Sequence, residues 1–598
     1  MRILPAGDAA LLVELADLAH TLALYRALQT QPIADVHELV PAARTLLVHF
    51  HPELLAPPAL IATLRRTASA LAAHAAEPPP PGRIVEIPVR YDGEDLAELA
   101  EHLGVSAREL VARHTGQPWQ AAFAGFAPGF VYLAGGDALF TQIPRRKTPR
   151  TRVPAGSVAL AGDFSAIYPS ASPGGWQLIG TTECALWDLA RAEPALVQPG
   201  FQVRFVETGR MVVAGGNPSP QPSPQRGEGV PGSSASRVSP PLPLGEGRGE
   251  GQQRLDGHAA VDAPAAPIPT FPQRGKELDA EIYKRNRSPE LTQQSLSAIE
   301  IINPGLQTLI QDEGRHGLAG LGISASGTLD RPAMHQANRL VGNPPDAPVL
   351  ENLLGGLQLR ALGRATLAVA GADAPLHLTA LDGRAWPVPN HAAIALDAGD
   401  VLRIGAPVAG VRCYLAVRGG WQVDAVLGSC ATDTLAHVGP AALHTGQRLF
   451  AGHAIAAHAL AACAPPEAPH PALPRAGDEV LLDVLLGPRT DWFTPEAIAL
   501  LPIQPWQVTP QSNRVGMRLQ GAAPLTRARH DELPSEGTVI GAIQVPASGQ
   551  PVLFLADHPL TGGYPVIAVL ARHHRSLAAQ IPVGCLLRFR VIASFKEG

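Results

Sequence analysis

A basic cluster between two glycine-rich segments is the first part of the sequence that could do chemistry. The segment Arg145–Arg152 (RRKTPRTR) follows Gly125–Leu133 (GFAPGFVYL) and precedes Ser172–Trp176 (SPGGW). Arginine offers a planar fork that fits phosphate or carboxylate, and paired glycines let backbone N–H groups approach an anion closely. A solvated basic loop beside a turn is the alternative. The expected nucleotide- or substrate-binding residues here are Arg145, Arg150, Gly174, Gly175 and Trp176.

The second half of the chain has a comparable set of polar residues near turn glycines. Glu536 and Asp557 lie at the edges of expected strands, where two carboxylates could share acid–base work or hold magnesium. Ordinary turn chemistry is the alternative, since Asp and Gly favour turns. We predict Glu536 and Asp557 as catalytic. The expected binding residues of this half are Asp312, Arg315, Ser326, Asp330, Asn513, Arg514, Gln544, Thr561, Gly562, Gly563 and Tyr564.

His114 is the third catalytic candidate. It ends a helical segment, so the alternative is a histidine that interacts with the helix dipole. No metal site is expected, because the five cysteines form no CxxC pair and HExxH is absent. The sequence also lacks a GxxxxGK[ST] loop and a GxSxG elbow. Any nucleotide chemistry would therefore need a pocket built from glycine loops and arginines.

Composition limits the class of protein. A chain of 598 residues with 46% hydrophobic residues has enough material for about three to five domains. The net charge of −5 gives no indication of nucleic acid or an anionic membrane as a partner. The N-terminus does not read as a signal peptide, and no apolar run approaches the roughly 18 residues that span a bilayer. We expect a soluble, cytoplasmic protein.

Proline-rich segments divide the chain. PPPPGR (Pro78–Arg83) and APPEAPHPALPRAG (Ala464–Gly477) read as hinges, and residues 208–297 read as a disordered Pro/Gly/Ser-rich linker. The expected order is a small N-terminal α/β domain (1–80), a β-barrel (81–207), the linker (208–297), and two further β-barrel regions (298–470 and 471–598).

An internal repeat favours related β-barrels. VPAGSVALAG (153–162) with SPGGWQLIG (172–180) resembles VPASGQPVLFLA (545–556) with LTGGYPVIA (560–568). Gly200–Phe205, Gly399–Ile404 and Gly584–Phe589 share one strand pattern. Helices are expected at Asp17–Leu28, at Glu94–Arg113 with a break at Gly104, and at Asp330–Val341 with Asp330 as N-cap.

These motifs resemble a known family. GFAPGFVYL, PRRKTPRTRVPAGSVALAG and IYPSASPGGWQLIG are similar to the B subunit of 5-oxoprolinase, also called allophanate hydrolase subunit 1 or Kip. GLQTLIQDEGRHG, SGTLDRPAMHQANRLVGN and GAIQVPASGQPVLFLADHPLTGGYP are similar to the C subunit of that enzyme. The resemblance implies an α+β, β-rich fold with cyclophilin-like β-barrels. It implies ATP-dependent hydrolysis of 5-oxo-L-proline to L-glutamate, with ATP and Mg²⁺ and with the LamB/YcsF-type A subunit of the enzyme as partner.

Phosphorylating the oxygen of a lactam would supply a leaving group before water attacks. Two other readings stay open: the carboxyltransferase part of a urea carboxylase, and a Kip-type inhibitor of a histidine kinase. Self-association into a homo-oligomer also stays open. Asn513 and the segment His558–Leu560 depart from the family pattern, which has Asp in place of Asn513 and Arg-Gln-Thr in place of His558–Leu560.

Overall fold

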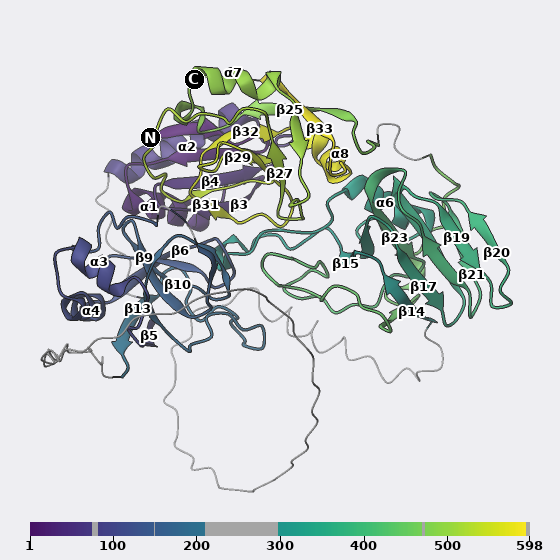
Figure 1. Cartoon of the computed structure of the whole chain (residues 1–598), viewed down its shortest axis with the longest axis horizontal. Coiled ribbons are helices and arrows are strands. Elements are labelled where there is room, and N and C mark those ends of the chain that lie inside the picture. Colours follow the sequence, from purple (N-terminus) through teal and green to yellow (C-terminus); the bar gives the residue numbers. More distant parts are fainter. Residues whose placement is uncertain (74–81, 147, 149, 210–296, 469–472, 594–598) are drawn as a thin grey trace, which may run out of the picture. The chain divides into compact units, whose positions relative to one another are not determined.

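The computed structural model describes residues 1–73, 82–146, 148, 150–209, 297–468 and 473–593. The predicted linker, apart from residues 208, 209 and 297, lies outside this range, and so does Lys147 of the basic cluster. Both described halves belong to one compact unit. Strands dominate (Figure 1), so the prediction of a β-rich α+β fold is confirmed.

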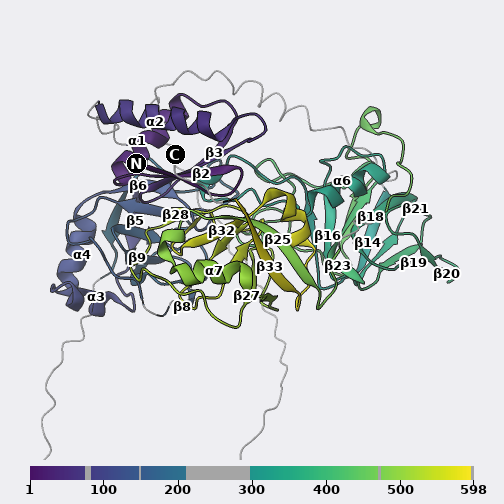
Figure 2. The same ribbon diagram turned by 90° about the horizontal axis from the view of Figure 1, so that it is seen from above.

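An antiparallel sheet with two helices on one face forms the N-terminal part (Figure 2). Asp17 caps the first helix by accepting the backbone N–H of His20. Along the strands, Leu11 and Val13 pack against the helices, while the alternating Leu12 packs against the C-terminal barrel. The elements are β1 (Arg2–Pro5), β2 (Ala10–Glu14), α1 (Leu18–Thr30), β3 (Val36–Pro41), β4 (Thr45–Phe50) and α2 (Pro57–Ala73), in strand order β1-β2-β4-β3.

A seven-stranded sheet follows, in the order β12-β9-β10-β7-β6-β13-β5. A bridge between Arg90 and Thr181 joins its two ends. The two predicted short helices are present, with Ser106 capping the second. The elements are β5 (Ile84–Val89), α3 (Leu96–His102), α4 (Ala107–Gly116), β6 (Trp119–Ala124), β7 (Val131–Ala134), β8 (Arg150–Val153), β9 (Ser157–Ala161), β10 (Phe164–Ile167), β11 (Ser172–Gly174), β12 (Gln177–Thr181) and β13 (Gln202–Glu207).

The second half begins with a six-stranded and a five-stranded sheet that share one apolar core. The predicted helix is α6, and the side chain of Asp330 accepts the N–H of Ala333 as its cap. The elements are β14 (Ser297–Pro304), β15 (Gln307–Gln311), η1 (Ala319–Leu321), α6 (Arg331–Leu340), β16 (Val349–Leu353), β17 (Leu357–Ala361), β18 (Ala365–Asp373), β19 (Leu376–Thr379), β20 (Ala385–Val388), β21 (Ala393–Leu396), β22 (Val401–Ile404), β23 (Ala409–Val417), β24 (Arg448–Ala451) and η2 (Ala457–Ala459).

A closed barrel completes the chain, in the order β25-β32-β29-β30-β27-β26-β33. Its elements are β25 (Glu479–Leu486), η3 (Thr490–Trp492), α7 (Pro495–Ile503), β26 (Trp506–Val508), β27 (Gly516–Gln520), β28 (Glu536–Gly537), β29 (Ala542–Gln544), β30 (Val552–Phe554), β31 (Thr561–Gly562), β32 (Val566–Leu570), η4 (Arg572–His574), α8 (Arg575–Ala579) and β33 (Leu586–Ala593). Among the described residues, no helix combines the length and the apolar character needed to cross a bilayer.

The two barrels are copies of one topology. Raising each strand number of the first sheet by twenty gives the order of the second, and the small pair β8–β11 corresponds to β28–β31. The Gly-Gly pairs of the predicted repeat fall on equivalent strands. The Val-Pro-Ala elements do not: Val153 ends β8 before β9, whereas Val545 follows β29. The predicted alignment of the two Val-Pro-Ala elements is therefore wrong. A short turn sequence of this kind can occur at positions that are not equivalent in the two barrels.

One glycine-led turn occurs three times. Gly200, Gly399 and Gly584 each have φ between 90° and 95°, which favours glycine. Each donates its N–H to a residue of a neighbouring strand, and that same residue donates its own N–H back to the turn. The predicted third copy, Gly399–Ile404, therefore has the same local structure as the other two, although its sheet has a different strand order.

Candidate functional site

Asp557 lies at the centre of a buried network of charged and hydroxyl groups. Arg514 donates to its two oxygens at 3.0 Å each, and the hydroxyls of Ser326 and Thr434 donate at 2.7 and 2.6 Å. Burial opposes ionisation of Asp557, but Arg514 and these hydrogen bonds outweigh burial and lower its pKa. Arg514 also reaches Glu351 at 2.5 Å. The carboxylate is fully buried, and its hydrogen bonds tie together the segments that carry Ser326, Thr434 and Arg514.

Asp433 lies beside this network, and its pKa is shifted in the opposite direction to that of Asp557. Burial, together with the nearby Asp557, raises the pKa of Asp433 to about 6. The backbone N–H groups of Leu435 and Ala436 donate to it at 2.9 and 2.8 Å. Asp433 and Thr434 were missed at the sequence level. Their signal was the run Ser429–Thr434, which places three hydroxyl residues and one carboxylate within six positions.

Other predicted residues of the second half surround the same network. Arg315 is buried, donates to the carbonyls of Val426 and Ala431, and leaves Nη1 without a partner among the described residues. Burial lowers the pKa of Arg315. Asp312 accepts from the Ser429 hydroxyl at 2.6 Å and so fixes the same loop. The structure thus brings Asp312, Arg315, Ser326, Arg514 and Asp557 together.

Asp330 and Asn513 hold turns at the edge of this network. Besides capping α6, Asp330 accepts from the side chain of Gln580 at 2.8 Å. The side-chain oxygen of Asn513 accepts the N–H groups of Val515 and Gly516. Asparagine can make these turn bonds as well as aspartate, so this departure from the family pattern preserves the local backbone.

Glu536 lies in a separate, solvent-reaching cavity of about 220 Å³. Arg489 binds both oxygens of Glu536 and also lies 3.4 Å from Glu14 of the N-terminal sheet. Burial raises the pKa of the Glu536 carboxyl, and Arg489 acts against that rise. The cavity is lined by Arg2, Glu14, Arg44, Thr45, Arg489, Trp492, Arg529, Glu532, Leu533, Pro534, Ser535 and Glu536.

The chain's two halves meet beside this cavity through hydroxyl groups. The Ser535 hydroxyl donates to the Tyr132 hydroxyl at 3.2 Å, and Thr561 lies 3.3 Å from the same oxygen. Arg145 binds Glu532 through its backbone N–H at 3.0 Å and lies against Gly563, where an added Cβ would collide with the guanidinium. Tyr132 was quoted in the glycine-rich motif but was not among the predicted site residues. The sequence cannot indicate its partners, which are about 400 positions away.

Arg150 does not reach this contact. It binds Asp95 at 2.8 Å and Glu94 at 3.0 Å, while Arg146 also binds Asp95. Arg146 and Arg150 are therefore neutralised by acids of their own barrel, whereas Arg145 pairs with Glu532 of the second half. Gly174 pairs with Arg150 across β11 and β8, and Gly175 accepts the N–H of Arg146. Trp176 packs in the aromatic core with Phe130 and Tyr132.

Gln544 and Tyr564 contact each other beside the Gly562–Gly563 turn. The Gln544 amide donates to the Tyr564 carbonyl at 3.0 Å, and a Cβ at Gly562 would meet that amide. Arg527 lies 5.6 Å from the centroid of the half-exposed Tyr564 ring. These residues give the turn a fixed shape, with one aromatic face open to solvent.

The structure places His114 away from both groups. It is fully buried between the Tyr91 hydroxyl at 2.7 Å and the Ser165 hydroxyl at 3.0 Å, and it stacks on Phe205. Burial lowers its pKa to about 3. Trp119 donates to the His114 carbonyl as Trp506 donates to Leu501 in the other barrel. His114 therefore occupies the place of a core leucine, and neither a catalytic nor a dipole role fits that position.

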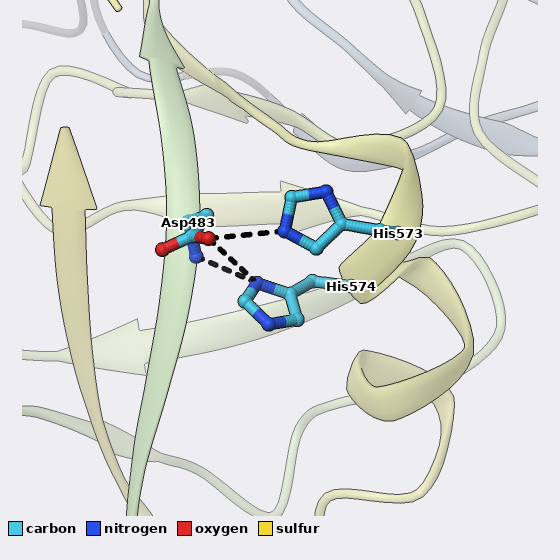
Figure 3. Close-up of side chains that lie close together, drawn as sticks. All are labelled: Asp483, His573 and His574. Atoms are coloured by element: carbon cyan, nitrogen blue, oxygen red, sulfur yellow. Dashed lines mark hydrogen bonds and ion pairs between the residues drawn. The ribbon is translucent and has the colours of Figure 1, made fainter. Parts of the chain in front are cut away.

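One group among the described residues could offer three ligand atoms to a metal: Asp483, His573 and His574 (Figure 3). Arg590 donates to both Asp483 oxygens at 2.6 and 2.9 Å, and the Asp483 N–H donates to His574 at 2.8 Å. The group is thus already satisfied by hydrogen bonds. Glu536 and Asp557 each carry an arginine partner, so they do not fit the open carboxylate set that Mg²⁺ takes.

Comparisons with known proteins agree with this architecture. The family description "Carboxyltransferase domain, subdomain C and D" matches residues 1–197, and "Carboxyltransferase domain, subdomain A and B" matches residues 321–591. The chain is similar to the C subunit of 5-oxoprolinase from Escherichia coli K12 (37% identity over 301 residues, 49% of this chain). It is similar to the B subunit of 5-oxoprolinase from Escherichia coli O157:H7 (49% identity over 131 residues, 21% of this chain).

The matched lengths differ among the relatives. The alignment spans 90% of that C subunit and 59% of that B subunit, but 16% of the urea amidolyase of Saccharomyces cerevisiae, which is 32% identical over 315 residues, 49% of this chain. The crystal structure of TTHA0988 superposes with a TM-score of 0.70 and 31% identity, over 97% of this chain and 99% of that one. The chain therefore belongs to the family of the 5-oxoprolinase B and C subunits, joined here in one polypeptide built on carboxyltransferase domains.

Proposed function

We propose that this chain is the B and C component of an ATP-dependent 5-oxoprolinase, which hydrolyses 5-oxo-L-proline to L-glutamate with a LamB/YcsF-type subunit. The observation that supports it best is the joining of two carboxyltransferase-type halves, whose relatives carry the names of two subunits of that one enzyme. In this proposal the chain is a hydrolase component acting on a cyclic amide.

The cavity at Glu536 is the proposed position of the small substrate. Its volume of about 220 Å³ lies below the roughly 300–1,000 Å³ of sites for drug-sized ligands, so it suits a small polar molecule better than a nucleotide. Arg2, Arg44 and Arg529 line it and can orient a carboxylate. Glu536 is buried there with a raised pKa, which suits a group that holds and returns a proton.

The contact between the halves would position the reacting amide. Tyr132, Ser535 and Thr561 present three hydroxyls at one point, and Arg145 borders them through Gly563. ATP would supply the phosphoryl group that turns the amide oxygen into a leaving group. The accompanying Mg²⁺ is part of the proposal, but the carboxylates of the cavity all have arginine partners, and we assign no step to the ion.

A purified-component assay tests the proposal. The full chain, the LamB/YcsF-type subunit, ATP and 5-oxo-L-proline should together release L-glutamate and ADP, and omission of any one should stop release. Gly563→Ala should reduce turnover about tenfold or more, because its Cβ displaces Arg145. Gly116→Ala is the matched control, since nothing lies within 4 Å of its added Cβ. Glutamate release without ATP, or none in the complete mixture, would contradict the proposal.

A carboxyltransferase role is the second candidate, supported by the matched domain descriptions and by the likeness to urea amidolyase. It predicts transfer of a carboxyl group from carboxylated biotin to an amide such as urea. The same preparation can be tested with free carboxybiotin and urea. Carboxyl transfer without any 5-oxoproline-dependent ADP release would favour this candidate over the first.

A further inference from the structure

Arg489 is shared by two carboxylates that belong to different halves of the chain. Its Nε donates to Glu536 at 2.9 Å, and both of its terminal nitrogens lie 3.4 Å from one oxygen of Glu14, at the end of β2. Arg2 lies directly opposite Glu14 on β1, with its Nε 3.3 Å from the other Glu14 oxygen, and it also lies 3.6 Å from Asp491. We call these residues the charge chain: Glu536, Arg489, Glu14, Arg2 and Asp491.

The charge chain runs from the protein interior to solvent. The side chains of Arg489 and Glu536 are 3% and 10% exposed, Glu14 is 23% exposed, and Arg2 and Asp491 are 45% and 41% exposed. Three carboxylates therefore share two guanidinium groups. Two acids that share one arginine each receive only part of its stabilisation, and each disfavours ionisation of the other. The more buried of the two, Glu536, is the one in which proton uptake is made easier.

The other charged groups around Glu536 do not replace Glu14 in this role. Arg44 lines the same cavity but is exposed, so water and salt screen its charge. Burial raises the pKa of the Glu536 carboxyl, Arg489 opposes that rise, and the negative charges of Glu14 and Asp491 add to it. The remaining charges of the cavity lie in ion pairs with groups outside the charge chain: Arg529 with Asp531 at 3.4 Å, and Glu532 with Arg145 at 3.7 Å.

The N-terminal sheet also holds the strand that carries Glu536. The N–H of Ala43 donates to the carbonyl of Ser535 at 3.2 Å, next to β28. On the other side of Glu536, a Cβ added to Gly537 would collide with the Leu47 side chain of β4. Glu14 belongs to the same sheet, since β2 pairs with β4. The contact of this sheet with β28 therefore fixes where Glu14 lies relative to Arg489 and Glu536.

We propose that Glu14 is a positioning residue for Glu536: by competing for Arg489 and through its own negative charge, it keeps Glu536 ready to take up and release a proton. The N-terminal sheet thus completes an acid–base group that the C-terminal barrel carries. The catalytic use of this proton rests on the function proposed above, whereas the effect of Glu14 on proton binding does not.

Infrared spectroscopy of the full chain tests the effect on proton binding without any substrate. In each protein, the carboxylic-acid C=O absorption that Glu536→Gln removes reports the protonated form of Glu536, and titration from pH 3 to pH 8 gives its midpoint. We expect Glu14→Gln to lower this midpoint by about one pH unit or more, because a like charge is removed and Arg489 is left to Glu536. Glu300→Gln is the matched control, a glutamate that pairs with Arg360 at 2.9 Å on another sheet, and it should leave the midpoint unchanged.

Two further variants make the outcome decisive. Glu14→Asp keeps the charge and should titrate closer to wild type than Glu14→Gln does; an equal shift in both would refute the role of the charge. An unchanged midpoint in Glu14→Gln overturns the proposal. If Glu14→Gln does not fold, Asp491→Asn takes its place, since it removes a like charge from the other end of the charge chain. It should lower the midpoint too, and an unchanged midpoint there also overturns the proposal.

The reconstituted assay then connects the proton to turnover. Glu14→Gln should shift the pH profile of L-glutamate release to lower pH in step with the infrared midpoint, and Glu14→Asp should restore it toward wild type. A midpoint that moves while the pH profile stays fixed would exclude Glu536 as the proton-carrying group. If no protein releases glutamate, the proposed function fails, while the infrared titration still decides the role of Glu14.

Discussion

Arg150 and Glu536 occupy the same position in two copies of one barrel, with opposite charge. Arg150 lies opposite Gly174 on β8–β11, and Glu536 lies opposite Gly562 on β28–β31. Their partners are reversed in the same way: Asp95 binds Arg150, and Arg489 binds Glu536. The N–H of Asp95 donates to Leu178 as the N–H of Arg489 donates to Val566, so the partners are equivalent too. Each barrel thus keeps one ion pair at this corner, with a buried acid in each pair.

The ion pair of the first barrel predicts a structural effect for Arg150→Ala. Asp95 has a side chain only 2% exposed and would retain Arg146 but lose one of its two charged donors. We expect the free energy of unfolding to fall by about 1–3 kcal/mol, as for a hydrogen bond to a charged group. Urea denaturation measures it. Arg152→Ala, an exposed residue on the same strand, should stay within about 0.5 kcal/mol of wild type. An equal effect of both substitutions would contradict this role.

The buried network predicts that Asp557→Asn acts on structure as well as on activity. The substitution removes the charge that balances Arg514 inside the protein, although Glu351 remains beside that arginine. Breaking a buried pair costs about 3–5 kcal/mol, and the remaining Glu351 should reduce this. Thermal melts should show a clear loss, together with loss of substrate-dependent ATP hydrolysis. A fully stable but inactive Asp557→Asn protein would instead indicate a direct chemical role.

The raised pKa of Asp433 predicts that the free energy of unfolding depends on pH, and Asp433→Asn should remove this dependence. Its pKa is raised from 3.8 to about 6 on folding, so the folded state binds the proton more tightly than the unfolded state. Its favourable contribution is complete below about pH 4 and is lost as pH rises through 6. At about 1.4 kcal/mol per pH unit, the wild type should lose on the order of 2–3 kcal/mol relative to Asp433→Asn across this range. Denaturant unfolding at pH 4, 5, 6 and 7 measures the difference in free energy of unfolding between wild type and Asp433→Asn. A difference that does not change with pH would contradict the raised pKa of Asp433.

The contact between the halves predicts that the two parts reassociate. Separately expressed residues 1–209 and 297–598 should co-purify, because Leu4, Leu12 and Leu47 pack against Val539, Phe554 and Val569. Tyr132→Phe should weaken the association about tenfold, since it leaves the buried hydroxyls of Ser535 and Thr561 without that partner. Tyr25→Phe is the control, because the Tyr25 hydroxyl accepts from Gln29 of the same helix, α1. Parts that never associate would contradict the packing.

The elements with local signals were predictable, and the contacts between them were not. Asp17 and Asp330 are N-caps that mark the start of their helices, and Gly200 and Gly584 form the turns that precede their strands. These effects act within a few residues and can be predicted from local sequence. The surroundings of His114 could not be predicted, because Tyr91, Ser165 and Phe205 come from other parts of the chain. A histidine at a helix end has the same local sequence whether it faces solvent or a core.

The network around Asp557 illustrates the same division. Arg315, Ser326, Arg514 and Asp557 were each recognised as chemically capable, and the structure brings them together. Their degree of burial was not accessible from the sequence, since it depends on packing between the barrel and the preceding sheets. The loop residues Asp433 and Thr434 complete the network from a part of the chain that is distant in sequence from all four.

The reversed ion pairs also bear on how a chain with two like barrels reaches one folded state. Tandem copies of a domain are prone to exchange strands during folding, since each copy offers the other a matching sheet. If the β8–β11 pair of strands entered the wrong barrel, Arg150 would lie against Arg489, and the converse exchange would place Glu536 against Asp95. Either error places two like charges side by side, which is unfavourable. The charge reversal thus distinguishes the copies from each other, and it opposes domain swapping within this single polypeptide.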